Sequence, residues 1–200
     1  MKQLICLAIA LLTSIGNISQ AQTAKQVLDK CAKVVSNKGG ATASFSMTMP
    51  KTTAMKGTIS IKGKKFTASS NDGKMWFDGK TLWTYVKKNQ EVNVSTPTAT
   101  QLSRLNPYNF INLYKAGYTS TMKKSGNLYD VKLKKAGAEI PEMNIKISSG
   151  NYHPVQVKLT DKKGRTTTID ISNFKTANLK DNIFKFDSKA YPKAEIIDLR

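Results

Sequence analysis

The sequence predicts a mainly β protein of the α+β class, built on one curved antiparallel sheet with two short helices. Apolar and polar residues alternate in about ten short segments, which is the pattern of strands with one buried face. Glycine, serine and asparagine separate several of these segments, as at 125–127 and 149–151, and these residues favour tight turns. Helical spacing of apolar residues occurs in two places only, so the sheet is expected to dominate the fold.

The first 21 residues have the pattern of a signal peptide. A short basic start, Met1–Gln3, precedes an apolar run, Leu4–Ile15, and small residues follow at Ser19 and Ala21. We expect cleavage after Ala21 and export of the remaining chain. Residues 22–200 are long enough for one domain with a sizeable core.

The first helix is expected at 24–36, and Asn37–Gly40 is a typical helix stop. Its apolar residues recur at helical spacing; they are Val27, Leu28, Cys31, Val34 and Val35. Cys31 is the one cysteine that remains after the predicted cleavage, so no internal disulfide can form. Its place on the apolar face indicates a small buried hydrophobic residue.

Strands follow this helix to the end of the alternating pattern. They are centred on Phe45–Met49, Ile59–Ile61, Phe66–Ala68, Val92–Val94, Tyr129–Leu133, Met143–Ile147, Val155–Leu159 and Ile169–Ile171. Two more strands form a hairpin around Asp78-Gly79, for which we predict a two-residue turn. On its second strand, alternation places Trp83 and Tyr85 on one face and Leu82 on the other.

The second helix is expected after Asn106, which can cap a helix that begins at Pro107. This insert carries Phe110, Ile111 and Leu113. Because every strand is apolar on one side, a flat open sheet would expose a large apolar surface. The sheet therefore closes as a barrel or curls around the helices.

The chain is strongly basic, with a formal net charge of +19, or +18 once Lys2 leaves with the signal peptide. An exported protein does not meet the genome, so nucleic acid is not an expected partner. The charge favours anionic lipid headgroups or acidic glycans. Alternatively, the lysines form a solvated face that protects the sheet edges and keeps the protein soluble.

No catalytic or metal-binding pattern is present in the sequence, and no cofactor is expected. The one histidine, His153, precedes Pro154 in a turn, which leaves no His-based triad or multi-histidine metal site. Acidic residues are few and scattered, and nothing in the sequence fixes a distance between two of them. We therefore expect a binding protein rather than an enzyme.

Several segments together resemble the periplasmic lipoprotein carrier family, the LolA-like proteins. They are ATASFSMTM at 41–49, GTISIKG at 57–63, DGKTLWTY at 78–85, and FKFDSKAYPKAEIIDLR at 184–200, with a proline-centred helix between the last two. The resemblance implies an incomplete barrel with a helical lid. It also implies a monomeric periplasmic carrier that shields lipoprotein acyl chains between an inner-membrane exporter and an outer-membrane acceptor.

Candidate residues for the apolar cavity follow from the strand pattern and this resemblance. They are Phe45, Met47, Met49, Ile59, Ile61, Phe66, Met75, Trp83, Tyr85, Phe110, Ile111, Leu113, Met143 and Ile145. For each methionine, ordinary core filling is the alternative. The same cavity would also suit a carrier of another lipid or hydrophobic molecule, and a module that docks on a membrane or partner protein is a third possibility.

One segment departs from the family pattern. LolA-like proteins have an arginine soon after the strand that corresponds to 57–62, and it hydrogen-bonds the lid. This chain has lysines there, at Lys62, Lys64 and Lys65, and lysine lacks the rigid fork of donors of arginine. The neighbouring Phe66 matches an aromatic residue at the family's cavity rim; the alternative is a core phenylalanine.

Overall fold

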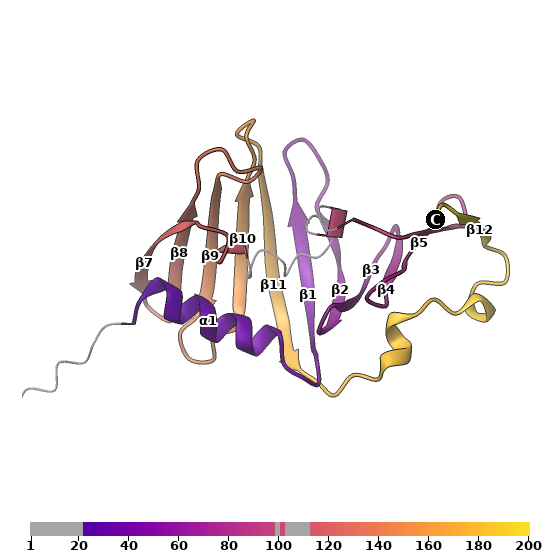
Figure 1. The fold of residues 1–200 in the computed structure, drawn as a ribbon, viewed down its shortest axis with the longest axis horizontal. Coiled ribbons are helices and arrows are strands. Elements are labelled where there is room, and N and C mark those ends of the chain that lie inside the picture. Colours follow the sequence, from indigo (N-terminus) through magenta and orange to yellow (C-terminus); the bar gives the residue numbers. More distant parts are fainter. Residues whose placement is uncertain (1–21, 99–100, 103–112) are drawn as a thin grey trace, which may run out of the picture.

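The computed structural model describes residues 22–98, 101–102 and 113–200 (Figure 1). The predicted signal peptide, and the predicted helix at Pro107 with its candidates Phe110 and Ile111, lie outside the described residues. No helix within the described ranges is long and apolar enough to cross a bilayer.

One open sheet of 12 strands forms the body of the protein, in the order β12-β6-β5-β4-β3-β2-β1-β11-β10-β9-β8-β7. Its strands are β1 (Ala41–Thr48), β2 (Met55–Lys62), β3 (Lys65–Ser70), β4 (Gly73–Phe77), β5 (Leu82–Val86), β6 (Glu91–Ser95), β7 (Thr119–Ser125), β8 (Leu128–Lys134), β9 (Glu142–Ser148), β10 (Pro154–Thr160), β11 (Thr166–Thr176) and β12 (Glu195–Asp198). All neighbours are antiparallel except β12 and β6, which are parallel. The two outermost strands, β12 and β7, do not pair with each other, so the predicted incomplete barrel is confirmed.

Helix α1 (Ala24–Val35) confirms the first predicted helix. It begins at a capping box, in which the Thr23 hydroxyl accepts from the Gln26 backbone and the Gln26 side chain accepts from the Thr23 backbone. Figure 1 shows α1 crossing the half of the sheet that contains β7 to β11. Its apolar face is part of the main core, and Cys31 is fully buried there, as predicted.

The side of the sheet that α1 covers is called the inner face here, and the other side the outer face. Residues that lie directly opposite each other on neighbouring strands point to the same face. The register therefore assigns whole rows of residues: Ile61, Phe66, Phe77 and Leu82 form one inner row across β2 to β5. Val131, Ile145, Val157 and Ile169 form another across β8 to β11.

The C-terminal segment, residues 177–200, packs on the outer face of the half of the sheet that contains β1 to β6. It contains two short 3-10 helices, η1 (Asp181–Phe184) and η2 (Ser188–Ala190), before β12. Phe186 and Tyr191 contact the Trp76 ring edge-on, each with 5.4 Å between centroids, and Tyr191 also contacts Tyr85 at 4.7 Å. These contacts cover the outer face of β4 and β5 with aromatic side chains.

Two lysines fix this segment electrostatically. Lys62 and Lys65 lie 2.9 and 2.8 Å from the Asp181 carboxylate, and Lys62 also donates to the Leu179 carbonyl oxygen at 2.8 Å. Hydrogen bonds from Lys65 and then Lys62 lower the pKa of Asp181 to about 2. The lysines at the position of the family arginine thus bind the C-terminal segment.

The structure differs from the sequence prediction in two local features. Strands β7 and β12 are not among the ten strands that alternation predicted, and the sequence of β7, TSTMKKS, contains Met122 as its single apolar residue. The hairpin between β4 and β5 has a four-residue turn, Asp78–Thr81, instead of a two-residue one. The Asp78 carboxylate accepts hydrogen bonds from the backbone N–H groups of Lys80 and Thr81, and this side-chain turn replaces the tighter one.

Candidate apolar binding site

The inner face has a closely packed half under α1. Six of its inward side chains on β8, β9 and β10 are fully buried; they are Val131, Leu133, Met143, Ile145, Ile147 and Val157. Two of the predicted site residues, Met143 and Ile145, belong to this group. Their side chains are core residues, and this half forms a fixed wall.

The other half of the inner face, on strands β1 to β6, is only partly covered. Phe45, Met47 and Met75 are half-buried and pack against the core, and Met49 is 40% exposed. Methionine is unbranched and polarizable, so it adapts to irregular partners. These four predicted residues therefore present apolar surface on β1, just after its end at Met49, and on β4.

The strand register extends this surface beyond the predicted residues. Met47 lies opposite Met55 on β2 and opposite Ile169 on β11. Met55 is half-buried and was not among the sequence candidates. Its signal was weak because Met55 begins its strand, ahead of the alternation that identified Ile59.

A glycine supports the Phe45 ring. Phe45 lies opposite Gly57, and a Cβ atom built on Gly57 would be 2.8 Å from Cζ of Phe45 and 2.2 Å from the Ser69 carbonyl oxygen. No side chain fits at this point of β2. The phenylalanine ring therefore lies against the backbone of the neighbouring strand.

Three predicted residues form the floor below this surface. Ile59, Ile61 and Phe66 are buried, and Phe66 is 0% exposed. Its ring centroid is 5.5 Å from that of Phe77. Of the two interpretations of Phe66, the burial fits a core residue better than an exposed rim contact.

Trp83 and Tyr85 lie on the outer face, away from the other candidates. Trp83 is opposite Trp76, and Tyr85 contacts Tyr191 of the C-terminal segment. Both belong to the outer aromatic layer because residues alternate along β5, which leaves Leu82 as its buried inner side chain. They are therefore left out of the proposed site.

Leu113 is half-buried and packs against the core. The segment that follows it is held at both ends. The Tyr114 hydroxyl donates to the Asp29 carboxylate on α1, and the Tyr118 hydroxyl donates to the Ile140 carbonyl oxygen at 2.8 Å. Burial and then the Asp29 carboxylate raise the pKa of Tyr114, which keeps its hydroxyl a donor.

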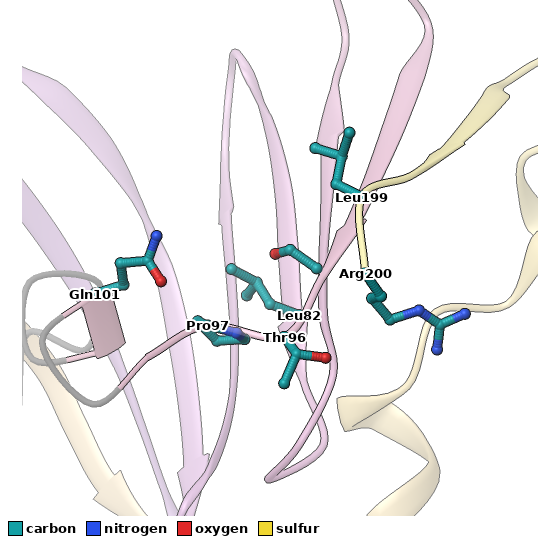
Figure 2. A pocket seen from close by; sticks show the side chains of 7 residues that line it. Leu82, Thr96, Pro97, Gln101, Leu199 and Arg200 are labelled. Carbon is teal, nitrogen blue, oxygen red and sulfur yellow. The ribbon is translucent and has the colours of Figure 1, made fainter.

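A pocket of about 650 Å³ lies at the end of the partly covered half (Figure 2). Its lining consists of Leu82, Ser95, Thr96, Pro97, Gln101, Leu199 and Arg200. The inner row that contains Phe66 and Phe77 runs through Leu82 to Ser95 on β6, and both Leu82 and Ser95 line the pocket, so the pocket continues the inner face. Pockets of 300–1,000 Å³ are typical of small-molecule sites.

Sequence reasoning missed most of this pocket. Leu199 is 63% exposed, and its backbone N–H donates to the Val94 carbonyl oxygen at 2.8 Å, which places it beside β6. The Arg200 guanidinium pairs with Asp198 at 2.5 Å. The path of the C-terminal segment across the outer face brings these residues there, and no periodicity marks that path.

The chemistry of the inner face is apolar. Within residues 22–98, 101–102 and 113–200, no group of three His, Cys, Asp or Glu side chains could hold a metal ion. His153 packs against Phe174 with 4.5 Å between ring centroids, and burial lowers its pKa. Burial likewise raises the pKa of the Cys31 thiol to about 12. The site can hold an apolar group by surface burial.

A family model described as "Outer membrane lipoprotein carrier protein LolA" matches residues 15–164. No curated protein sequence matches the chain.

Among solved structures, an uncharacterized conserved protein from Thermus thermophilus is similar, with 12% identity and a TM-score of 0.60 over 88% of this chain and 99% of that one. A chain of the Pseudomonas aeruginosa MucA/MucB complex has 9% identity and a TM-score of 0.50 over 83% of this chain and 62% of its own length. At these identities the structural similarity concerns the fold alone. Because the family match extends over most of its length, this chain belongs to the LolA family of outer membrane lipoprotein carrier proteins.

Proposed function

We propose that this protein is a periplasmic carrier that shields the acyl chains of lipoproteins on the partly covered half of its inner face. The observation that supports the proposal is a set of apolar side chains on the inner face, with Met47, Phe45 and Met75 only half-buried and Leu82 at the pocket. Phe45, Met47 and Met75 on this surface are half-buried, whereas Val131, Ile145 and Val157 on the other half of the same face are fully buried. A ligand that covers this surface would complete the core.

The energetics favour a lipid anchor as the ligand. Each methylene removed from water contributes ~0.8 kcal/mol, so a chain of about 15 methylenes gains roughly 12 kcal/mol before the costs of association. A lipoprotein anchor therefore needs a sheath to cross an aqueous compartment. A partly exposed, methionine-rich surface also lets the chain leave, since Phe45, Met47 and Met75 can repack when it is gone.

The lid mechanism of the family is not part of the proposal. Lys62 and Lys65 engage Asp181 and the C-terminal segment on the outer face, so they are committed to a different contact. We propose instead that ligand retention depends on the inner apolar surface itself.

The decisive experiment compares two neighbouring residues of β1. Met47→Gln keeps the length of the side chain but makes the inner face polar, whereas Ser46→Gln places the same glutamine side chain on the outer face, which is already polar at this position. Protein from the native host should carry acyl-chain ligand, detected by native mass spectrometry. Met47→Gln should lose most of it and Ser46→Gln should keep it. Equal retention by both variants, or a ligand-free wild-type protein, would contradict the proposed site.

Carriage of another lipid or hydrophobic molecule is the second candidate, because the same apolar surface would serve it. Depletion in the host separates the two. Stranding of outer-membrane lipoproteins at the inner membrane supports lipoprotein carriage, with an inner-membrane exporter and an outer-membrane acceptor as partners. Normal lipoprotein sorting with a changed lipid composition favours the second candidate.

A further inference from the structure

The outer face of β7 to β10 carries a regular pattern of lysines. One row across these strands reads Lys123, Asp130, Lys146 and Gln156. The adjacent row reads Thr121, Lys132, Asn144 and Lys158. We call Lys123, Lys132, Lys146 and Lys158 the outer lysine patch. It lies opposite the fully buried wall, because Lys132 alternates with Val131 and Leu133 along β8.

Two carboxylates of this face, Asp130 and Asp170, accept hydrogen bonds from amide side chains instead of pairing with the patch lysines. Asp130 accepts a hydrogen bond from the Asn144 side-chain nitrogen at 2.6 Å, and Asp170 accepts one from the Gln156 side-chain nitrogen at 2.7 Å. Other charged groups nearby pair with each other, as Lys134 does with Glu142 at 3.4 Å. Among the described residues, no carboxylate lies within salt-bridge distance of any of the four patch lysines.

The spacing of the patch makes it a concentrated field. Lysines in one row are two strands apart, about 10 Å between backbones, and the two rows are about 7 Å apart along the strands. These distances are at or below the Debye length of about 10 Å at 0.1 M salt, so the four charges repel one another. Asp130, the one carboxylate in the two rows, offsets one of them, and the rows keep a net positive charge. An extended anionic surface would relieve that repulsion, and no apolar side chain interrupts the rows named above.

We propose that the outer lysine patch docks the protein on an anionic lipid surface. The use of lysine favours headgroups over a specific carboxylate partner, since lysine is a hydrated point charge without the bidentate fork of arginine. A chain with this net charge meets such a surface readily. Docking through the outer face leaves the inner face and its pocket directed away from the headgroups, so the surface acts independently of ligand binding.

Two variants of equal charge test this inference. The patch variant carries Lys123→Gln, Lys132→Gln, Lys146→Gln and Lys158→Gln. The control variant makes the same change at four other exposed lysines, Lys87, Lys88, Lys185 and Lys189, on the β5–β6 turn and the C-terminal segment. Each protein is sedimented with phosphatidylglycerol vesicles and with phosphatidylcholine vesicles, and its thermal unfolding is recorded to establish that it folds.

The wild-type protein and the control variant should bind phosphatidylglycerol vesicles and not phosphatidylcholine vesicles, and binding should weaken as salt rises. Each lysine near an anionic surface contributes about fivefold, so the patch variant should bind at least about 100-fold more weakly than wild type. An equal loss in the control variant would show that net charge, not this face, causes binding. No vesicle binding by the wild type would overturn the proposal. Tighter binding to polyglutamate than to phosphatidylglycerol vesicles at matched charge would also overturn it, in favour of an acidic polypeptide partner.

Discussion

Replacement of Phe66 by alanine tests whether this residue belongs to the core beneath the proposed site or contacts the ligand. Phe66 is fully buried, lies opposite Ile61 and Phe77 on the adjacent strands, and contacts the Phe77 ring. Truncation of a fully buried phenylalanine costs about 3–5 kcal/mol, because apolar contacts are lost and a cavity remains. For a domain of this size each kcal/mol lowers Tm by about 2–4 °C, so the expected decrease is about 6–20 °C.

The matched comparison is Met47→Ala on the same face. Met47 is half-buried, so its truncation should cost about 1–2 kcal/mol, below the full range for a buried methionine. Both variants are measured by thermal unfolding with circular dichroism and by urea titration in the ligand-free state, and then by ligand content. Met47→Ala should lose ligand with a small change in Tm, whereas Phe66→Ala should lose stability first.

The opposite result would refute this assignment of roles. If Phe66→Ala unfolds within about 2 °C of wild type and has lost its ligand, the ring is a contact residue and not part of the core. If Met47→Ala destabilises as strongly as Phe66→Ala, the surface on β1 is ordinary core and the site has been misplaced.

Three further predictions follow from other parts of the structure. The pKa of Asp181 is about 2 in the folded chain, against an ordinary value of 3.8. Its lysine contacts therefore stabilise the folded protein fully above pH 3.8, and this stabilisation is lost as pH falls from 3.8 towards 2. Asp181→Asn lacks the carboxylate and should show a smaller loss of Tm than wild type between pH 4 and pH 2. Cys31 should resist alkylation at pH 8 in the folded mature protein and react after denaturation in urea, because its thiol is buried with a pKa of about 12; rapid labelling of the folded protein would contradict its burial. Gly57→Ala should lower the free energy of unfolding in urea by about 1–3 kcal/mol, because the new Cβ atom would meet the Ser69 carbonyl oxygen. Gly150→Ala has open space at its Cβ, so its free energy of unfolding should stay within about 0.5 kcal/mol of wild type.

Alternation predicted most of the sheet because each predicted strand packs one face against a core. Strand β8, with Val131 and Leu133 between lysines, shows this clearly. Strand β7 escaped prediction for the same physical reason: it is an edge strand with one inward methionine, and its outer residues are polar. A polar edge strand leaves almost no periodic signal.

The sequence predicted only part of the site, and the reason is related. Periodicity identifies which residues share a face, and it correctly grouped Phe45 with Met47. It does not state which face of a hairpin will be covered by a distant segment. Trp83 and Tyr85 therefore required the structure, since it is the C-terminal segment that makes their side of β5 an aromatic layer.

The pairing of β1 with β11 has a consequence for how the protein folds. Strands β1 to β6 and strands β7 to β11 are each local meanders, in which every strand pairs with its neighbour in the sequence. The seam between β1 and β11 joins segments from opposite ends of the described chain, and the parallel pair of β12 and β6 depends on a similarly distant contact. Because the closure of long loops slows non-local pairing, the two meanders are expected to form first and to join in the rate-limiting step. The residues proposed to contact the ligand lie on β1, β4 and β5, all within the first meander, so their surface is expected to form before the seam joins it to the fixed wall on β8 to β10.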